Sequence, residues 1–318
     1  VIGVLEYLEK LVEDKEYEKA LEYAEQLLLN PENKPWDMMV IYAMLLQARF
    51  ETAEFYGAQV AGQLAVKMAQ DLEAWDYYGT STLCLGTSYD RLGQKENALS
   101  AWYDYLAHVT LYRYDLKPMH HVMVLYNIGL VLAELERFEE SLVTLRKAAE
   151  TAMHYNNQRA AHGIRHALID AHLKFGRVEE VPRLLAQSAH YLRHNTGVVD
   201  YMQSLLWHQV LRVRYAVETH RLKRAAKVAE RGLRLAEGWP NVLYQMHLWL
   251  ARIHEQSGDI RRALQEALHA RTVAMSSRRF DLEFAAANYV YGLLSSHGDL
   301  AGSFVTDDSE AWVPPATS

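Results

Sequence analysis

The sequence predicts an all-α protein, a right-handed superhelix of about eight antiparallel helical hairpins. Three observations support this prediction. Gly and Pro are scarce while half of the residues are hydrophobic, which favours helix along the whole chain. A pattern of small and large apolar residues, clearest at 85–102, recurs along the chain at helical spacing. A length of 318 residues also suggests two domains or an elongated repeat rather than one compact core.

The clearest hairpin sets the register for the others. Small or apolar residues recur at helical spacing before Gly93, which we expect to end the first helix in a left-handed conformation. The second helix would then return antiparallel to the first. Gly86 and Ala98 are small where the two backbones would approach each other. Tyr89 and Trp102 are expected to fill the space on either side.

This hairpin resembles a tetratricopeptide repeat (TPR) at every position of that family's pattern. The matching residues are Leu85-Gly86, Tyr89, Gly93, Ala98 and Trp102. Positions equivalent to Ala98 recur at intervals of 35 to 44 residues, longer than the minimal period of about 34. We assign these positions to Ala20, Phe55, Ala98, Ser141, Val181, Ala225, Ala263 and Ser303. Such long repeats are similar to those of kinesin light chains, of regulators with a sugar-sensing TPR domain, and of bacterial peptide-pheromone receptors of the Rap, PlcR and NprR group.

Some units depart from the pattern. The second is the least regular because Phe55 falls where a small residue is expected, and in the sixth His220 replaces the turn glycine. The eighth is expected to end in a truncated second helix from Asp299. No change in composition marks a second domain, so residues 1–305 are predicted to form one solenoid domain. Residues 306–318 are predicted to form a disordered or loosely docked tail.

Composition also argues against several functions. Residues 1–160 carry 14 Lys and Arg against 24 Asp and Glu, whereas the remainder carries 19 against 16, so we expect no direct nucleic-acid binding. The single cysteine, Cys84, rules out an internal disulfide framework and is expected to be a buried structural thiol. Without a long apolar run or a signal peptide, the chain is expected to be cytoplasmic, with no membrane partner.

Motifs for catalysis and metal binding are not found. The sequence has no phosphate-binding glycine loop and no nucleophile elbow, so we expect neither enzymatic activity nor a cofactor. His162 and His166 are four residues apart, as are His190 and His194, which places each pair on one helix face. Because no HExxH, carboxylate triad or second cysteine accompanies them, no metal site is predicted.

The resemblance to TPR proteins implies that the first helix of each hairpin lines a concave groove. Transferring the groove positions one at a time gives a candidate lining that includes Thr87 and Glu255, and within it the candidate residues for binding a peptide or a protein partner. These candidates are Arg91, Tyr126, Asn127, Leu130, His166, Asp170, Lys174, Arg214, Gln245, Arg252 and Asn288.

Asn127 is the most informative candidate. Peptide-binding TPR domains place an asparagine at this position, where its amide offers donors and an acceptor to a peptide backbone. Arg214 and Arg252 could form forked hydrogen bonds with a carboxylate. In the alternative interpretation, Asn127 bridges neighbouring helices, and the arginines pair with Glu218 and Glu255 on solvated faces.

Three functions fit these features. The resemblance implies the ligand-sensing part of a bacterial regulator that holds a short linear peptide between polar side chains and apolar pockets lined by Tyr126, Leu130 and Trp249. A DNA-binding domain would then have to precede Val1, because this chain has no helix-turn-helix pattern. The alternatives are a constitutive adaptor between protein partners and a small-molecule sensor. The end units either cap the array or form a homodimer.

Overall fold

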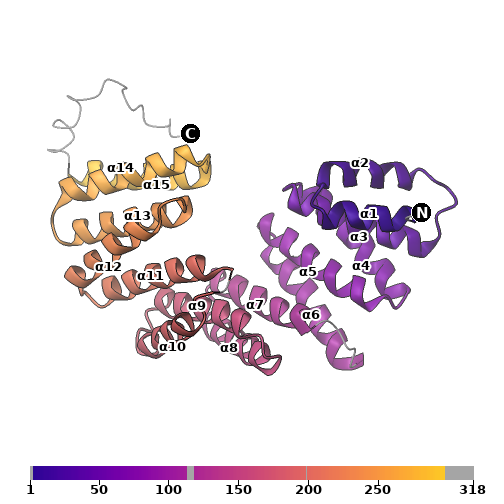
Figure 1. The fold of residues 1–318 in the computed structure, drawn as a ribbon, viewed down its shortest axis with the longest axis horizontal. Coiled ribbons are helices and arrows are strands. Elements are labelled where there is room, and N and C mark those ends of the chain that lie inside the picture. The colour runs from indigo at the N-terminus through magenta and orange to yellow at the C-terminus, as the bar shows by residue number, and fades with distance from the viewer. Residues whose placement is uncertain (1–2, 113–117, 198, 298–318) are drawn as a thin grey trace, which may run out of the picture. The chain divides into compact units, whose positions relative to one another are not determined.

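The structure is a computed structural model that describes residues 3–112, 118–197 and 199–297 (Figure 1). Over these residues it consists of fifteen α-helices in sequence, packed as helical hairpins, which confirms the predicted all-α class. The chain divides into two compact units, Val1–Ala171 and His172–Ser318, with the division inside α9 (Gln158–Lys174). The predicted single solenoid over residues 1–305 stays a prediction. Gly298, Asp299, Ser303 and the predicted tail lie outside the described residues.

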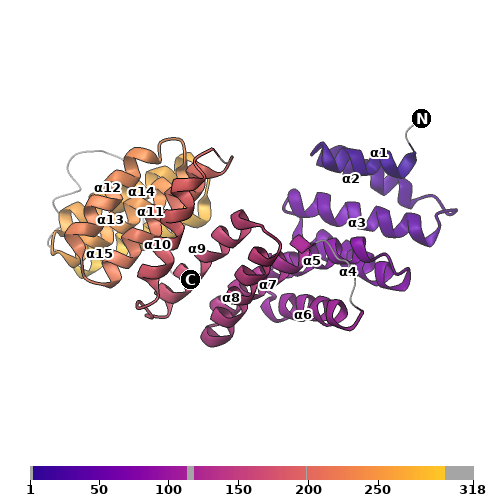
Figure 2. The same cartoon turned by 60° about the horizontal axis from the view of Figure 1, so that its bottom comes forward.

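Unit 1 contains four hairpins, each formed by an odd-numbered helix and the even-numbered helix that follows it (Figure 2). The odd-numbered first helices of neighbouring hairpins also contact each other, α1 with α3, α3 with α5 and α5 with α7. They therefore form a continuous layer, the first-helix layer. The helices are α1 (Val4–Glu13), α2 (Tyr17–Leu28), α3 (Pro35–Glu51), α4 (Phe55–Asp71), α5 (Trp75–Arg91), α6 (Lys95–Tyr112), α7 (Pro118–Glu134) and α8 (Phe138–His154).

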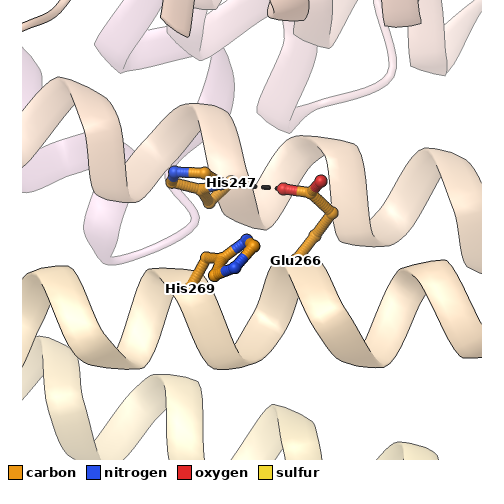
Figure 3. Close-up of side chains that lie close together, drawn as sticks. All are labelled: His247, Glu266 and His269. Carbon is orange, nitrogen blue, oxygen red and sulfur yellow. Dashed lines mark hydrogen bonds and ion pairs between the residues drawn. The ribbon is translucent and has the colours of Figure 1, made fainter.

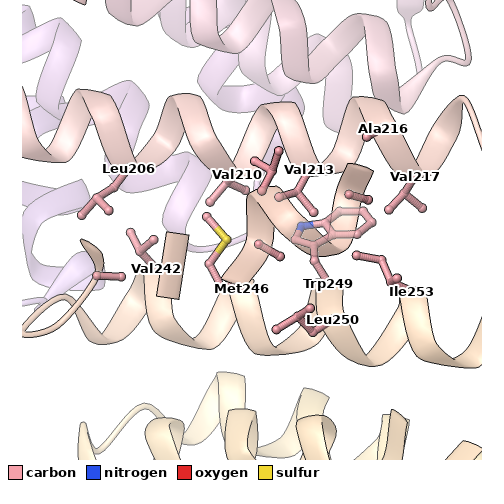
Figure 4. Packing of buried hydrophobic residues seen from close by; sticks show 14 residues of the cluster. Leu206, Val210, Val213, Ala216, Val217, Val242, Met246, Trp249, Leu250 and Ile253 are labelled. Carbon is pink, nitrogen blue, oxygen red and sulfur yellow. The ribbon is translucent and has the colours of Figure 1, made fainter. Parts of the chain in front are cut away.

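Unit 2 repeats this arrangement. Its helices α11 and α12 pair, α13 and α14 pair, and the first helices α11 and α13 contact each other. Figure 4 shows the apolar core where α11 and α13 meet, with Val213 packed near Met246 and Trp249. The helices are α10 (Val181–His194), α11 (Tyr201–Glu218), α12 (Leu222–Leu235), α13 (Pro240–Gln256), α14 (Ile260–Ser276) and α15 (Phe280–Ser296).

Every turn between the two helices of a hairpin contains one residue with a positive φ. Gly93 has φ 74° and His220 has φ 54°, so both turn assignments are confirmed. The residue after the turn residue donates its N–H to the carbonyl five positions earlier, as Gln94 does to Tyr89 at 2.8 Å. This bond satisfies a carbonyl that the end of the helix would leave unpaired. The turn residues are Lys15, Ala53, Gly93, Glu136, Gly176, His220 and Gly258, spaced 38 to 44 residues apart.

The turns correct the predicted register of the second hairpin. Five residues after each turn residue lies a small or β-branched side chain that is at most 1% exposed. In the second hairpin this residue is Ala58, which is fully buried, whereas Phe55 merely opens α4 and is half-buried. The expectation that Phe55 takes the small-residue position is therefore wrong by three residues. It failed because Ala53, unlike a glycine, gives no sequence signal for a left-handed turn.

Three hairpins of unit 1 interlock through one position seven residues before the turn residue and another nine residues after it. A Cβ on Gly86 would lie 2.2 Å from Nε1 of Trp102, so this glycine makes room for the indole ring. The second hairpin reverses the sizes, with Leu46 packed against Gly62. Tyr89, in contrast, is only half-buried, and its hydroxyl accepts a hydrogen bond from Gln63 of α4 at 2.8 Å. Tyr89 therefore contacts the preceding hairpin. The prediction that it fills space inside its own hairpin is wrong.

Replacing Gly93 by alanine should destabilise unit 1 by about 1 kcal/mol, because a left-handed backbone is costly for a residue with a Cβ. The added methyl group would meet no atom within 4 Å, so the cost is one of backbone conformation alone. Gly292, inside α15, is equally open but helical, and Gly292→Ala should stabilise its unit by about 0.5–1 kcal/mol. Chemical denaturation followed by circular dichroism measures both. A stabilising effect of both substitutions would contradict the turn geometry.

Candidate functional site

The structure places all eleven predicted binding residues on odd-numbered helices, the first helices of their hairpins. They fall into two groups, one in each unit. Unit 1 holds Arg91 on α5, Tyr126, Asn127 and Leu130 on α7, and His166 and Asp170 on α9. Unit 2 holds Lys174 at the end of α9, Arg214 on α11, Gln245 and Arg252 on α13, and Asn288 on α15.

The turn residues show which predicted residues are equivalent. Leu130 precedes its turn residue by six positions, as Arg252 does in unit 2, and Asn127 precedes the same turn residue by nine. Positions three or four residues apart share one helix face. The same face of α3 carries Met44 and Gln47, and the same face of α5 carries Cys84 and Thr87. Of these four, the sequence prediction included only Thr87, as part of the groove lining.

A cavity of about 310 Å³ opens on this face between α3 and α5, and we call it the first-helix hollow. Its wall combines apolar side chains with amide, hydroxyl and carboxylate groups. The lining residues are Ala43, Met44, Leu46, Gln47, Asp76, Tyr77, Thr80, Ser81 and Cys84. The sequence prediction assigned none of these residues to a binding site, and expected Cys84 to be a buried structural thiol.

Ser81 gives the first-helix hollow a polar group that lacks a partner. The side chain is 1% exposed, and within the described part of the chain its Oγ has no hydrogen-bond partner. A buried hydroxyl without a partner costs about 1–3 kcal/mol, which a ligand that bonds to it would recover. Gln47 contributes an amide that can both donate and accept. The hollow can therefore hydrogen-bond a peptide unit while Met44 and Leu46 contact apolar atoms.

Cys84 contributes bulk to the hollow rather than reactivity. Burial, together with the nearby charge of Glu51, raises the pKa of its thiol to about 12. Because the thiolate is the nucleophilic form, the side chain is a protonated, weakly reactive thiol near neutral pH.

Two of the predicted residues in unit 1 lie within electrostatic range of each other. Burial raises the pKa of Tyr126, and the negative charge of Asp170 raises it further, so Tyr126 of α7 lies near the carboxylate of α9. Asn127 is half-buried beside Tyr126. The middle of α7 and the C-terminal part of α9 thus present a phenol, an amide and a carboxylate. His166 lies edge-on against His162 of its own helix, with ring centroids 4.3 Å apart, and Arg91 is exposed on α5.

In unit 2, Arg252 stacks on an aromatic ring. Its guanidinium carbon lies 4.8 Å from the ring centroid of Trp249, one turn earlier on α13. Glu255 accepts a hydrogen bond at 2.5 Å from the hydroxyl of Tyr289, which neighbours the exposed Asn288 on α15. Trp249 itself is only 8% exposed and belongs to the apolar core of unit 2. The guanidinium fork of Arg252 remains exposed above it.

A second cavity, of about 470 Å³, lies between α10, α11 and α12 and is basic. Its charged lining consists of Arg212, Arg221 and Arg224, and Arg212 donates a hydrogen bond to Oε1 of Gln209 at 3.0 Å. Burial, together with the charges of Arg224 and Arg231, lowers the pKa of Arg212. Such a cavity suits an anionic group. The sequence prediction named Arg214 as the binding residue of α11 and did not name the arginines of the cavity. The basic run at 221–234 was the sequence signal that could have identified them.

No helix in the described part of the chain has both the length and the apolar character needed to cross a membrane.

Comparisons with known proteins agree with the hairpin geometry. Residues 124–152, which span the end of α7 and most of α8, match the tetratricopeptide repeat family. No curated protein sequence matches the chain.

Three solved structures have a similar fold at low sequence identity. One is a signal transduction ATPase with numerous domains and a tetratricopeptide repeat sensor, from Pyrococcus horikoshii, with 16% identity and a TM-score of 0.64 over 89% of this chain and 44% of that one. This chain therefore spans less than half the length of that ATPase. The apo quorum sensor NprR from B. thuringiensis has 11% identity and a TM-score of 0.63. The match covers 96% of this chain and 85% of NprR. The Rap conjugation gene regulator of plasmid pLS20, in complex with the Phr* peptide, has 16% identity and a TM-score of 0.57. The match covers 87% of this chain and 74% of the regulator.

At these identities the likeness concerns the fold alone. The matched repeat at 124–152 has the same left-handed turn as the other described hairpins, and the same interlocking positions as the second and third. A tetratricopeptide repeat is thus matched at residues 124–152, within a chain whose described helices pack as hairpins of the same kind.

Proposed function

We propose that this chain is the peptide-sensing part of a bacterial regulator, and that it binds a short linear peptide on the first-helix layer of unit 1. The observation that carries the proposal is the first-helix hollow between α3 and α5, with the unpartnered hydroxyl of Ser81 in its wall. Binding proteins or peptides is the general role of TPR domains. The proposed activity is recognition, without catalysis or nucleic-acid binding by this chain.

The groups on this layer match the parts of an extended peptide. Gln47 and Asn127 occupy the same helix face and offer amide groups to the peptide backbone. Met44 and Leu46 would contact its apolar side chains. Asp76 in the hollow, and Asp170 farther along, favour a peptide with a basic residue. A peptide is also the natural first ligand to test because the Rap regulator that shares this fold was solved with one.

A constitutive adaptor is the competing function, and it would use the same layer for a protein partner. The two differ in what a bound segment does to the domain. In a sensor, the ligand must bind one conformation better than another, so binding changes the exposure of helices away from the site. In an adaptor, hydrogen exchange would change only at the contact.

An array of short random peptides, probed with the purified chain, tests the proposal. We expect a subset of peptides rich in basic and apolar residues to bind, and binding to fall at least about tenfold in Ser81→Ala and Asn127→Ala, the effect of about 1.4 kcal/mol from one lost hydrogen bond. Asn97→Ala is the matched control. That asparagine is exposed on the second helix α6, and its amide donates a hydrogen bond to Oε1 of Gln94 at 3.0 Å.

The controls separate binding from folding. All three variants should keep the circular dichroism spectrum of the parent protein. If no peptide binds, or if Asn97→Ala weakens binding as much as the other two substitutions, the first-helix layer of unit 1 is not the recognition surface.

A further inference from the structure

Three potential metal ligands meet between α13 and α14 (Figure 3). His247 lies on α13, and Glu266 and His269 lie three residues apart on α14. Each offers one ligand atom, and these atoms all lie within 4.8 Å of one another. Nδ1 of His247 is 2.7 Å from Oε2 of Glu266. The sequence prediction missed the group because its members come from two helices and form no contiguous motif.

The position of Glu266 is unusual within the repeat. It lies eight residues after the turn residue Gly258. The equivalent residue of every other described hairpin is uncharged: Tyr23, Ala61, Ala101, Thr144, Leu184 and Val228. Glu266 therefore places a charged carboxylate at a position that holds an uncharged side chain in the other described hairpins. Such departures concentrate at functional sites.

The group is partly shielded from water. The side chains of His247 and Glu266 are 17% and 22% exposed, so both are largely screened from water, while His269 is open to it. An ionised carboxylate and neutral imidazoles are the forms that bind a metal ion.

We propose that His247, Glu266 and His269 bind a divalent transition metal ion of the zinc type. Two imidazoles and one carboxylate form a ligand set that zinc accepts, with a fourth position left for water. Two nitrogen ligands disfavour Mg²⁺ and Ca²⁺, which prefer oxygen. Ligand atoms about 2.1 Å from zinc would lie about 3.4 Å apart, so the present spacing needs only small side-chain rotations. The ion would tie α13 to α14 and thereby fix the hairpin of 240–276.

Zinc titration of the purified chain, after treatment with a chelator, tests the site. We expect one equivalent of Zn²⁺ to bind and to raise the melting temperature, because a ligand that binds only the folded state stabilises it. Co²⁺ in its place should give the visible absorption of a four-coordinate site. Magnesium should do neither.

Two variants locate the ligands, and a third is the control. Glu266→Gln and His269→Ala should each weaken zinc binding by at least about tenfold, the scale of even outer-shell changes at metal sites. His269 is exposed, so its replacement leaves the fold intact even if His247→Ala does not. His190→Ala is the matched control. It removes one member of the pair His190 and His194, whose rings are 4.3 Å apart on α10, outside the proposed site.

The outcomes are distinct. Zinc binding that is lost in Glu266→Gln and His269→Ala but kept in His190→Ala supports the site. If the parent chain binds no zinc, the three residues form only an ion pair with a neighbouring histidine, and the proposal fails. If zinc binding falls only in His190→Ala, the ion belongs to a surface histidine pair and the proposal also fails.

Discussion

Replacing Trp102 by alanine is expected to lower the free energy of unfolding of unit 1 by about 3–5 kcal/mol. The side chain is 1% exposed and belongs to an apolar cluster with Tyr78, Tyr105 and Ile128. Its indole lies against Gly86, where the two helices of the hairpin meet. Truncation removes the buried ring and leaves a cavity that a helix pair stacked between neighbours cannot easily close.

The measurement is urea denaturation followed by circular dichroism, with Tyr56→Ala as the control. Tyr56 is 73% exposed on α4, so its removal should change stability by about 0.5 kcal/mol or less. Because the chain has two units, the curves should be fitted with separate transitions where two are visible. A loss below about 1 kcal/mol for Trp102→Ala would mean that the indole is not a core element.

A second substitution tests the interlock itself. Gly86→Leu alone should be strongly destabilising, because even a Cβ at this position would overlap the ring of Trp102. In the Trp102→Ala background the same change fills the cavity, as Leu46 does opposite Gly62 in the second hairpin. The double variant should therefore be less destabilised than the sum of its single changes. Additive losses would contradict the direct contact.

Acidification from pH 7 to pH 4 should cost unit 2 about 3 kcal/mol through one residue, His208. This side chain is 5% exposed, and its Nδ1 lies 2.9 Å from Oγ of Ser188. Burial, assisted by the charge of Arg212, lowers its pKa to about 4. Arg221 and Arg224 line the same cavity and add to the positive surroundings.

The sign follows from the proton balance. In the unfolded chain a histidine has a pKa of about 6.5. Below that pH the unfolded state therefore binds a proton at His208 that the folded state does not bind. The stability contribution of neutral His208 is therefore complete above about pH 6.5 and is lost as the pH falls toward 4.

The measurement is the unfolding free energy as a function of pH for the parent chain and for His208→Gln. Glutamine keeps a polar side chain opposite Ser188 but cannot take up a proton. Between pH 6.5 and 4, the unfolding free energy of His208→Gln should fall by about 3 kcal/mol less than that of the parent chain. This holds even if the variant is less stable than the parent chain at pH 7. Parallel curves would show that His208 does not govern the acid sensitivity. The other histidines titrate in both proteins and cancel in the comparison.

The sequence predicted the hairpins because their interlocking residues carry a strong signal. Gly86, Ala98 and Trp102 are all buried in the hairpin that was taken as the reference. The register failed at Phe55, where a left-handed turn at Ala53 has no glycine to mark it. Backbone conformation at a non-glycine residue depends on the packing of both helices, which a local pattern does not contain.

The candidate site was only partly predictable for a related reason. The resemblance supplied positions on single helices, and these positions did fall on the first helices. The first-helix hollow depends on how α3 lies against α5, and residues such as Ser81 gain their significance only from burial without a partner. The three-ligand group on α13 and α14 likewise exists only through the contact of two helices.

Photo-cross-linking tests the central functional claim most directly. A peptide selected on the array, carrying a photoreactive group at one end, is irradiated with the chain, and the modified residues are identified by mass spectrometry. We predict cross-links on α3, α5 and α7, concentrated around Met44, Gln47 and Asn127. Cross-links confined to the second helices α4, α6 and α8 would contradict the assignment of the first-helix layer as the peptide-binding surface.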